Sequence, residues 1–550
     1  MSLRADLTRA IAEARDRAIE GGELTVAEGA KLPAIGLERP AKPEHGDWAS
    51  NVAMQLAPVV RAAPIRIAET IVTHLDQPAP IANVSIAPPG FLNLHLDAGW
   101  VAAQAGPIRA AGSTYGRDTV DEPRRINVEF VSANPTGPLH VGNARGAFVG
   151  DVLSRVLGAV GHHVEREYYF NDFGAQVINL GHSVLARRDA TELPEDGYRG
   201  EYVEALVAEL PDEVAARAAE QPAEAGRVVG AWATERVRAG IEASLARLGV
   251  EFDVWKEESS LHDGGWVERA VGRLRTSGHV FEDDGATWFR STAFGDDKDR
   301  VIYRSNGLPT YFASDIGYVT EKLSRGFDEL IYIWGADHHG TVARVRNAAE
   351  AMGFDREAVR MLLIAWVRFV RDGVEIPMSK RSGEFITLDD VLNEVGVDAA
   401  RWYFSSRAYT TGIDFDLELA KKQSNENPVY YVQYAHARAS SILRHAADAG
   451  VKPDASRTAE LLRHPAEQAL LRQLLDFPDA LATAAERRET HEVPRYCYEL
   501  ASAFSAFYRD CKVLTEDEPL SAARLALVDA TRSVLANGLD LLGISAPDAM

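Results

Sequence analysis

Residues 126–151 constrain the fold more than any other part of the chain. Residues 126–131 form an apolar run with polar interruptions, which is typical of a buried strand, and a loop rich in Asn, Pro and Gly follows. A helical pattern then begins near His140. A strand, a tight loop and a helix N-terminus together predict a site for anionic phosphate, because free backbone N–H groups and the helix dipole both point there.

This loop lacks both of the glycine patterns usually associated with nucleotide phosphates, GxxxxGK[ST] and GxGxxG. The sequence has His140 at the position where a phosphate would lie. A polar residue that only caps the helix is the alternative interpretation of His140.

The composition favours a large protein of several domains. The chain has 550 residues, 46% of them hydrophobic and 25% charged, which predicts three or four packed domains. No run of about 18 apolar residues occurs, and the first residues resemble an amphipathic helix rather than a signal, so we expect no membrane partner. The two cysteines, Cys497 and Cys511, argue against a Cys-rich zinc site and suit the cytoplasm. The net charge of −22 neither favours nor excludes RNA, because a local basic face can lie on an acidic protein.

The pattern of expected elements predicts a multidomain α/β protein. Residues 1–115 predict a small α+β domain that ends in a strand pair around residues 88–90. Residues 116–413 alternate between strands and helices, which predicts a Rossmann-like, doubly wound parallel sheet with a helical insertion near 193–300. Residues 414–550 show helix after helix, which predicts an all-helical bundle.

The individual elements can also be expected from these patterns. The expected strands of the sheet are 126–131, 164–170, 329–334 and 361–369, with a separate hairpin at 280–292. The expected helices of the bundle are 430–447, 466–490, 493–513 and 520–542.

Tyr311 and Asp315 are the clearest candidates for binding a cationic substrate. Their spacing of four places both side chains on one helical face, and Thr310 is the expected cap of that helix. A phenol beside a carboxylate can bind a planar guanidinium, because the carboxylate accepts two parallel N–H bonds. The alternative is a half-buried tyrosine next to a solvated aspartate.

Residues 334–341 contain Asp337, His338 and His339 directly after an expected strand. Adjacent histidines face different ways on a regular element, and the segment has neither HExxH nor a cysteine partner, so we expect no metal here. A segment at the end of a strand lies where a doubly wound sheet binds its ligand.

Residues 375–383 read GluIleProMetSerLysArgSerGly, a basic loop with small residues. Such a loop suits a lid that closes over a triphosphate, with a solvated basic turn as the alternative.

In the helical region, Tyr430, Tyr434 and Arg438 follow one another at a spacing of four. They either pack between helices or form a stacking surface for unpaired RNA bases.

These motifs, in this order, resemble those of class I aminoacyl-tRNA synthetases and of arginyl-tRNA synthetases in particular. Residues 138–143 resemble the HIGH motif, with Asn143 where a second histidine is more frequent. Residues 375–383 resemble the KMSKS loop, with Pro377 in place of the first lysine and Arg381 in place of the last serine. The resemblance extends over nearly the whole chain and is weakest near residues 193–249.

The resemblance assigns roles to individual residues. It implies catalytic roles for His140, Asn143 and Lys380. It implies ATP binding by Pro138, His140, Gly142, Asn143, Met378, Ser379 and Lys380. It implies arginine binding by Glu129, Ser132, Asn134, Tyr311, Asp315 and His338. It implies tRNA binding by Phe91, Asn93, Tyr430, Tyr434, Arg438 and Met550.

The resemblance also implies an activity, namely the activation of L-arginine with ATP and its transfer to tRNA(Arg). ATP is then a substrate that arrives with Mg²⁺, zinc is absent, and the chain is expected to be a cytoplasmic monomer. Two alternatives remain, another HIGH-bearing nucleotidyl transferase, such as a cytidylyltransferase, or an RNA-binding relative without catalytic activity.

Overall fold

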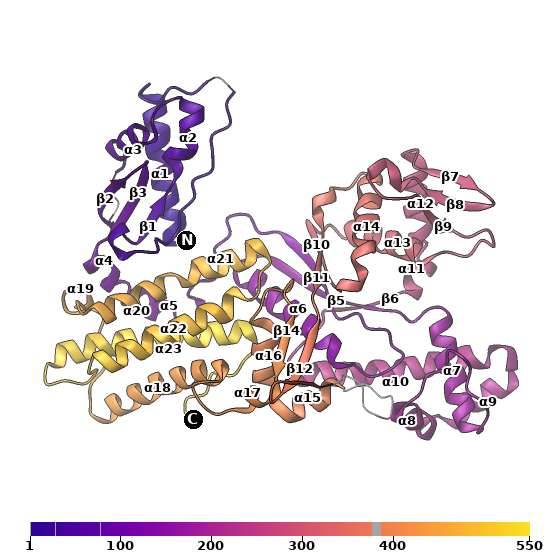
Figure 1. The fold of residues 1–550 in the computed structure, drawn as a ribbon. Coiled ribbons are helices and arrows are strands. Elements are labelled where there is room, and N and C mark those ends of the chain that lie inside the picture. Colours follow the sequence, from indigo (N-terminus) through magenta and orange to yellow (C-terminus); the bar gives the residue numbers. More distant parts are fainter. Residues whose placement is uncertain (1, 28, 77–78, 377–386) are drawn as a thin grey trace.

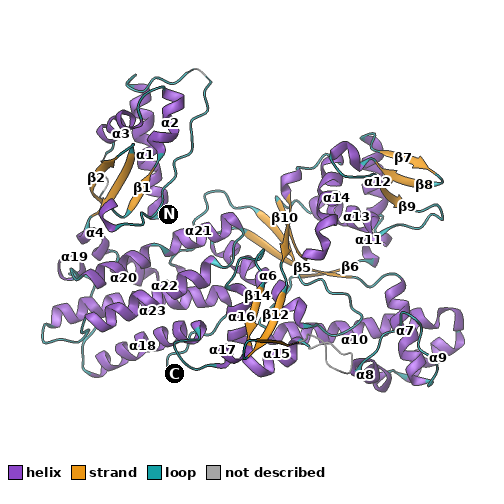
Figure 2. Cartoon of the chain, viewed as in Figure 1, coloured by secondary structure: helices purple, strands orange, loops and turns teal. Residues whose placement is uncertain are grey.

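The computed structural model describes residues 2–27, 29–76, 79–376 and 387–550. An N-terminal domain lies on a helical bundle, and a central sheet joins the bundle to two smaller units (Figure 1). The strands gather in the N-terminal domain, at the centre and in one outer unit, whereas the bundle is helical (Figure 2). The expected class is confirmed. In the part of the chain that is described, no helix has the length and apolar character needed to cross a bilayer.

The N-terminal domain is small and of the α+β type, as expected. Helix α1 (Leu3–Glu20) buries one face, formed by Leu3, Leu7, Ile11, Ala14 and Ala18 at helical spacing. Its antiparallel sheet has the order β1-β3-β2. The other elements are η1 (Pro43–His45), β1 (Trp48–Ser50), α2 (Val52–Val60), α3 (Pro64–Thr73), β2 (Ile81–Ala87) and β3 (Phe91–Leu96).

Two short helices carry the chain from this domain onto the bundle. They are α4 (Ala98–Ala103) and α5 (Ala105–Ala111), followed by η2 (Gly112–Thr114). Arg109 Nε lies 2.7 Å from Asp529 Oδ2, and Asn537 Nδ2 donates to the Gly112 carbonyl oxygen at 2.9 Å. The N-terminal unit expected to end at residue 115 therefore ends in helices that are packed against the C-terminal bundle.

The central sheet is parallel and has the order β11-β10-β4-β5-β6. Its strands are β4 (Arg125–Glu129), β5 (His163–Phe170), β6 (Val254–Glu257), β10 (Glu329–Gly335) and β11 (Val359–Ile364). The chain moves outward from β4 to β5 and β6, and then returns to the other side of β4 with β10. In such a doubly wound sheet, the ligand binds at the carboxyl ends of the strands where the order reverses, which here is between β4 and β10.

The connections of this sheet contain helices and one outer sheet. Helix α6 (Val141–Ala159) follows β4, and helix α14 (His339–Ala351) joins β10 to β11 through η5 (Ala336–His338) and η6 (Arg356–Ala358). Between β5 and β6 lie α7 (Ala175–Arg188), α8 (Glu201–Glu209), α9 (Asp212–Glu220), η3 (Pro222–Glu224) and α10 (Ala225–Arg247). Between β6 and β10 lie α11 (Ser259–Asp263), α12 (Trp266–Thr276), β7 (Val280–Asp283), β8 (Ala286–Phe289), η4 (Ser291–Phe294), β9 (Arg300–Tyr303) and α13 (Tyr311–Ser324). The expected insertion is thus two insertions, because β6 returns to the central sheet between them.

A second small sheet follows, with the order β13-β12-β14. The expected strand at 361–369 is two strands of different sheets, β11 and β12 (Val367–Arg371). Strand β14 (Ile413–Asp416) pairs with β12 in parallel, so the α/β region continues past residue 413 and the expected boundary was placed too early. The other elements here are β13 (Val374–Ile376), α15 (Leu388–Val395), α16 (Val397–Ser405) and α17 (Leu417–Lys421).

Residues 428–550, all of which are described, fold into helices alone, as expected. The helices are α18 (Pro428–Asp448), α19 (Thr458–Leu461), α20 (Pro465–Leu475), α21 (Phe477–Arg487), α22 (Glu492–Asp510) and α23 (Glu518–Leu542). The single helix expected at 466–490 is two helices, because Pro478 lacks the N–H that a continuous helix would need and stands in the first turn of α21.

A buried carboxylate at the amino end of β10 joins the sheet to the bundle. Glu329 forms ion pairs with Arg124, which precedes β4, and with Arg360 on β11, at 3.2 and 3.3 Å. It also binds Arg488, which lies just beyond α21, at 2.5 Å. Three segments that are far apart in the sequence therefore share one buried negative charge.

A buried arginine makes a second connection. Arg401 on α16 forms an ion pair with Asp151 on α6 and donates to the carbonyl oxygens of Leu248 and Leu542, each at 2.6 Å. Gly543 is the left-handed cap of α23 (φ 65°), and a Cβ there would lie 2.2 Å from Arg401 Nη2. This guanidinium thus fixes the helix that follows β4 against the end of the bundle.

Candidate active site

One large cavity opens at the carboxyl ends of β4 and β10, where the order of the sheet reverses. Its volume is about 1520 Å³. The candidate residues that line it are Glu129, Ser132, Asn134, Pro138, His140, Gly142, Asn143, Tyr311, Asp315 and His338. Met378, Ser379 and Lys380 lie outside the described residues. The structure therefore brings together every described candidate for ATP and arginine.

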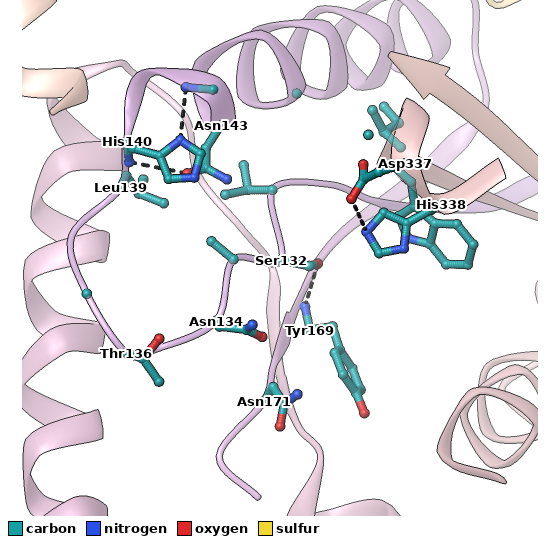
Figure 3. A pocket seen from close by; sticks show the side chains of 18 of the residues that line it. Ser132, Asn134, Thr136, Leu139, His140, Asn143, Tyr169, Asn171, Asp337 and His338 are labelled. Carbon is teal, nitrogen blue, oxygen red and sulfur yellow. Dashed lines mark hydrogen bonds and ion pairs between the residues drawn. The ribbon is translucent and has the colours of Figure 1, made fainter. Parts of the chain in front are cut away.

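The loop after β4 turns sharply into the cavity. Val131 and Ser132 have positive φ values of 66° and 39°, a conformation that costs a non-glycine residue about 1–3 kcal/mol and that often occurs at functional sites. The turn lets Ser132 Oγ donate to Glu129 Oε1 at 3.2 Å and accept from the Tyr169 backbone N–H at 3.1 Å. In Figure 3, His140 and Asn143 lie on one side of the cavity, His338 lies on the other, and Ser132 and Asn134 lie between them.

His140 is the N-cap of α6. Its Nδ1 accepts from the Gly142 backbone N–H at 3.0 Å, and Asn143 Oδ1 accepts from the His140 backbone N–H at 3.2 Å. Burial lowers the pKa of His140, which favours the neutral imidazole. Because Nδ1 is the acceptor, the neutral ring carries its proton on Nε2. The capping role and a donor role toward a ligand are therefore compatible.

Gly142 is needed for this cap. A Cβ at residue 142 would lie 2.8 Å from two atoms of the His140 ring. The glycine thus leaves space for the imidazole. Arg145, one turn further along α6, donates to the carbonyl oxygens of Ala365 and Ala408 at 2.8 and 2.9 Å and fixes the helix against the segment after β11.

Helix α13 carries Tyr311 and Asp315, and both side chains line the cavity, as their spacing predicts. Tyr311 is 76% exposed, so its ring is available to a ligand. Thr310 stands at the N-cap position of α13, as predicted, but its side chain accepts no hydrogen bond from the helix backbone. Thr310 Oγ1 donates to the Val301 and Ile302 carbonyl oxygens at 2.8 and 3.1 Å, because β9 lies directly beneath the start of the helix.

The cavity has a negatively charged region around Asp315. Burial raises the pKa of Asp315 to about 7, and the carboxylates of Glu258 and Glu129 add to this shift. Burial also raises the pKa of Glu258, which is hydrogen-bonded to Ser314 and Tyr169. A cationic ligand placed among these carboxylates would stabilise their ionised forms.

The sequence reasoning missed Glu258. This residue directly follows β6 and lies at the carboxyl end of the sheet, the position at which ligand-binding residues are expected. Its place at the end of a strand could have identified Glu258 as a candidate. Because β6 was not predicted, this position was not recognised. Tyr169 on β5 was missed for a related reason, because its strand was expected without a view of which residues face the cavity.

The residues of the expected loop 334–341 lie in η5 and at the start of α14. His338 is exposed, lies 3.6 Å from Asp337 Oδ2 in a histidine–carboxylate pair, and has its ring centroid 5.6 Å from that of Trp334.

The candidates for RNA binding lie away from this cavity. On α18 the rings of Tyr430 and Tyr434 are stacked, with centroids 6.1 Å apart and an angle of 6° between planes. The guanidinium carbon of Arg438 lies 4.7 Å from the Tyr434 ring centroid and 4.8 Å from that of Tyr508, which is 45% exposed. These four planar side chains follow one another in a row, which we call the aromatic row: Tyr430, Tyr434, Arg438 and Tyr508.

The remaining RNA candidates differ in how much surface they offer. Met550 is 52% exposed, at the end of a tail held to α18 by Ser440, which donates to Asp548 Oδ1 at 2.8 Å. On β3, Phe91 is half-buried, whereas Asn93 is only 4% exposed. The Asn93 side chain is buried and therefore offers little surface to an RNA.

Three family models match the chain in order. The model described as "tRNA synthetases class I (R), catalytic domain" matches residues 108–405, which places the sheet and its cavity in the class I aminoacyl-tRNA synthetase catalytic domain. The "Arginyl tRNA synthetase N terminal domain" matches residues 1–96, and the "DALR anticodon binding domain" matches residues 432–550. The chain belongs to the arginyl-tRNA synthetase family.

Relatives of known name agree over the whole length. The arginine–tRNA ligase of Moorella thermoacetica is 44% identical over 553 residues, which cover 99% of this chain and 98% of that protein. The arginine–tRNA ligase of Bacillus subtilis is 45% identical over 533 residues, or 96% of each chain. Among solved structures, Thermus thermophilus arginyl-tRNA synthetase superposes with a TM-score of 0.81 at 26% identity, and the match covers 100% of both chains.

Proposed function

We propose that this chain is an arginine–tRNA ligase that uses ATP. In the first step, the carboxylate of arginine attacks the α-phosphate of ATP, so that an acyl–phosphate bond forms, a P–O bond breaks, and pyrophosphate leaves. In the second step, the arginyl group moves to the terminal ribose of tRNA(Arg) and AMP leaves. Such chemistry depends on positioning and charge neutralisation more than on a protein nucleophile.

The observation that supports this proposal most strongly is that one cavity contains both a group of carboxylates and the N-terminus of a helix. The carboxylates of Asp315, Glu258 and Glu129 line its walls together with the start of α6. A cationic amino acid fits the carboxylates, and a polyphosphate fits a helix N-terminus. An aliphatic amino acid would displace water from these carboxylates without supplying a new hydrogen-bond donor, at a cost of about 1–3 kcal/mol for each one desolvated.

For ATP, we propose that Nε2–H of the neutral His140 and the Nδ2 amino group of Asn143 donate to phosphate or ribose oxygens. Pro138 and Gly142 shape the adjoining wall of the cavity. Met378, Ser379 and Lys380 complete the phosphate site, with the Lys380 ammonium neutralising the leaving pyrophosphate. Mg²⁺ enters with ATP as part of that substrate.

For arginine, we propose that Tyr311, Asp315 and Glu258 bind the guanidinium. Glu129, Ser132 and Asn134 hold the α-ammonium and carboxylate, and His338 closes the opposite wall. The exposed Tyr311 ring covers the planar cation once it is bound, since a guanidinium stacks well on an aromatic face.

For tRNA, we propose that the aromatic row on α18 stacks on unpaired bases and that the tail ending in Met550 borders the same surface. Planar rings with an arginine between them suit single-stranded RNA. Phe91 is the candidate contact of the N-terminal domain. We further propose that the enzyme acts as a monomer in the cytoplasm, which sedimentation of the purified protein and cell fractionation can test.

The decisive experiment is ATP–pyrophosphate exchange with a panel of amino acids, with and without total tRNA. We expect exchange with arginine and not with lysine, citrulline or leucine. Exchange that does not depend on arginine in either condition would refute the proposed function.

A further inference from the structure

Lys322 is fully buried, directly behind the carboxylate side chains that are proposed to bind arginine. It stands on α13, about two helical turns beyond Asp315. Its Nζ is 2.6 Å from Glu129 Oε2 and 3.9 Å from Glu167 Oε1. The ring centroids of Tyr318 and Tyr332 each lie 4.2 Å from the ammonium. An ammonium removed from water in this way is tolerated only when it is paired, so its environment was built around a charge.

The charge of Lys322 serves Glu129 more than Glu167. Glu167 already accepts from Arg325 Nη2 at 2.6 Å and from the Tyr318 hydroxyl, and it is fully buried. Glu129 has Ser132 Oγ on one oxygen at 3.2 Å and Lys322 on the other. Glu129 also lines the cavity, whereas Glu167 does not belong to its lining.

Each of the three carboxylates proposed to bind arginine has a different basic side chain as its neighbour. Arg344 on α14 acts on Asp315, and His262 on α11 lies 3.8 Å from Glu258. Lys322 is the cation in contact with Glu129. The groups proposed to bind the guanidinium and the group proposed to bind the α-ammonium are therefore balanced by different side chains.

We infer that Lys322 is a positioning residue for the α-amino end of arginine: through its bond to Oε2 it fixes the orientation of the Glu129 carboxylate, so that this carboxylate can bind the substrate ammonium. This inference rests on the proposed function. Lys322 itself does not touch the substrate and acts only through Glu129. Loss of the Lys322 charge should weaken binding of the substrate's α-ammonium group and leave binding of its guanidinium group unchanged.

The test compares the full-length enzyme with Lys322→Gln, a neutral donor of similar length, and with Lys322→Met. Lys256→Met is the matched control. Lys256 lies on the edge strand β6, forms an ion pair with Glu321 of α13 at 3.2 Å, and does not line the cavity. Exchange is measured with total tRNA present, and two analogues serve as inhibitors. One is 5-guanidinopentanoic acid, which lacks the α-amino group, and the other is citrulline, which has a neutral urea group.

We expect the KM for arginine to rise about ten- to hundredfold in both Lys322 variants, because a buried charged hydrogen bond is disrupted. Inhibition by 5-guanidinopentanoic acid should change less than about threefold, so the preference for arginine over this analogue collapses. The preference for arginine over citrulline and the KM for ATP should stay as in the parent enzyme.

Equal weakening of arginine and 5-guanidinopentanoic acid would overturn the inference, since a merely structural defect affects both ends of the ligand. An unchanged KM for arginine in a variant with an unchanged KM for ATP would overturn it as well. If Lys322→Met fails to fold, Lys322→Gln still decides the question, with thermal melting as the check. If the parent enzyme itself shows no arginine-dependent exchange, the proposed function fails, which is a separate and recognisable outcome.

Discussion

The carboxylate of Glu258 lies close enough to Asp315 to contribute to the rise of the Asp315 pKa to about 7. The two residues come from different elements, because Glu258 follows β6 and Asp315 lies on α13. A cation bound between them would relieve their mutual repulsion. The binding of arginine and the ionisation of this pair are therefore coupled.

The first prediction concerns pH. Below pH about 7 the Asp315 carboxyl is protonated in the free enzyme, so kcat/KM for arginine should fall as the pH decreases from 8 to 6. Bound arginine stabilises the carboxylate, so the acid limb of kcat should lie at lower pH than that of kcat/KM. Asp315→Asn should raise the KM for arginine by about tenfold or more, leave the KM for ATP nearly unchanged, and lose this limb. Equal changes in both KM values would contradict the assignment.

The second prediction separates the two roles of His140. His140→Ala removes both the cap of α6 and the Nε2–H donor, so kcat of exchange should fall about a hundredfold or more and stability by about 1 kcal/mol. His140→Asn keeps a good capping residue and should restore the melting temperature but not kcat. Recovery of kcat in His140→Asn would show that capping alone matters.

The third prediction concerns Lys380, which lies outside the described residues. Lys380→Ala should lower the rate of adenylate formation in single-turnover measurements by about a hundredfold, with little change in the affinity for arginine. An unchanged rate would exclude the proposed neutralisation of pyrophosphate.

The fourth prediction concerns the aromatic row. Tyr434→Ala should weaken tRNA binding about five- to hundredfold, because stacking on one base contributes about 1–3 kcal/mol. Tyr434→Phe keeps the ring and should bind tRNA almost normally. The KM for arginine should be the same in both variants, and filter binding with purified tRNA(Arg) provides the measurement. Equal affinities for Ala and Phe would place the bound bases elsewhere.

The fifth prediction concerns stability. Gly543→Ala places a Cβ 2.2 Å from Arg401 Nη2 at φ 65°, so it should cost about 3 kcal/mol or more from backbone strain and overpacking together. Gly450→Ala is the control, because Gly450 has a similar φ of 75° and nothing within 4 Å of the added Cβ. It should cost only about 1–2 kcal/mol, from the left-handed conformation alone. Equal losses in urea unfolding would mean that Arg401 moves aside freely.

Much of the fold could be predicted because its long elements have a clear period. Helix α1 and the four expected strand regions have apolar residues at the required spacing. Strand β6 could not be recognised, because Val254–Glu257 is short and half-buried throughout, so it shows no alternation. The separation of β11 from β12 was also hidden, because Ala365 and Trp366 continue the apolar run without a turn residue.

The site was predictable where motif and geometry coincide. His140, Tyr311 and Asp315 could be predicted as lining one cavity, since each stands next to the end of an expected element. Glu258 and Lys322 could not, because one depends on an unrecognised strand and the other on a contact between α13 and β4. An ion pair between residues this far apart in the sequence has no local signature.

The three-arginine contact of Glu329 has a consequence for how this chain can vary. Loss of Arg124 or Arg360, which are both partly exposed, would leave the carboxylate with two partners at modest cost, whereas Arg488 is itself buried. Replacement of Glu329 would instead leave several positive charges facing one another at the amino end of the sheet. Substitutions are therefore tolerated unequally within this cluster. The exposed arginines can be replaced one at a time, whereas a replacement of Glu329 affects all three arginines at once.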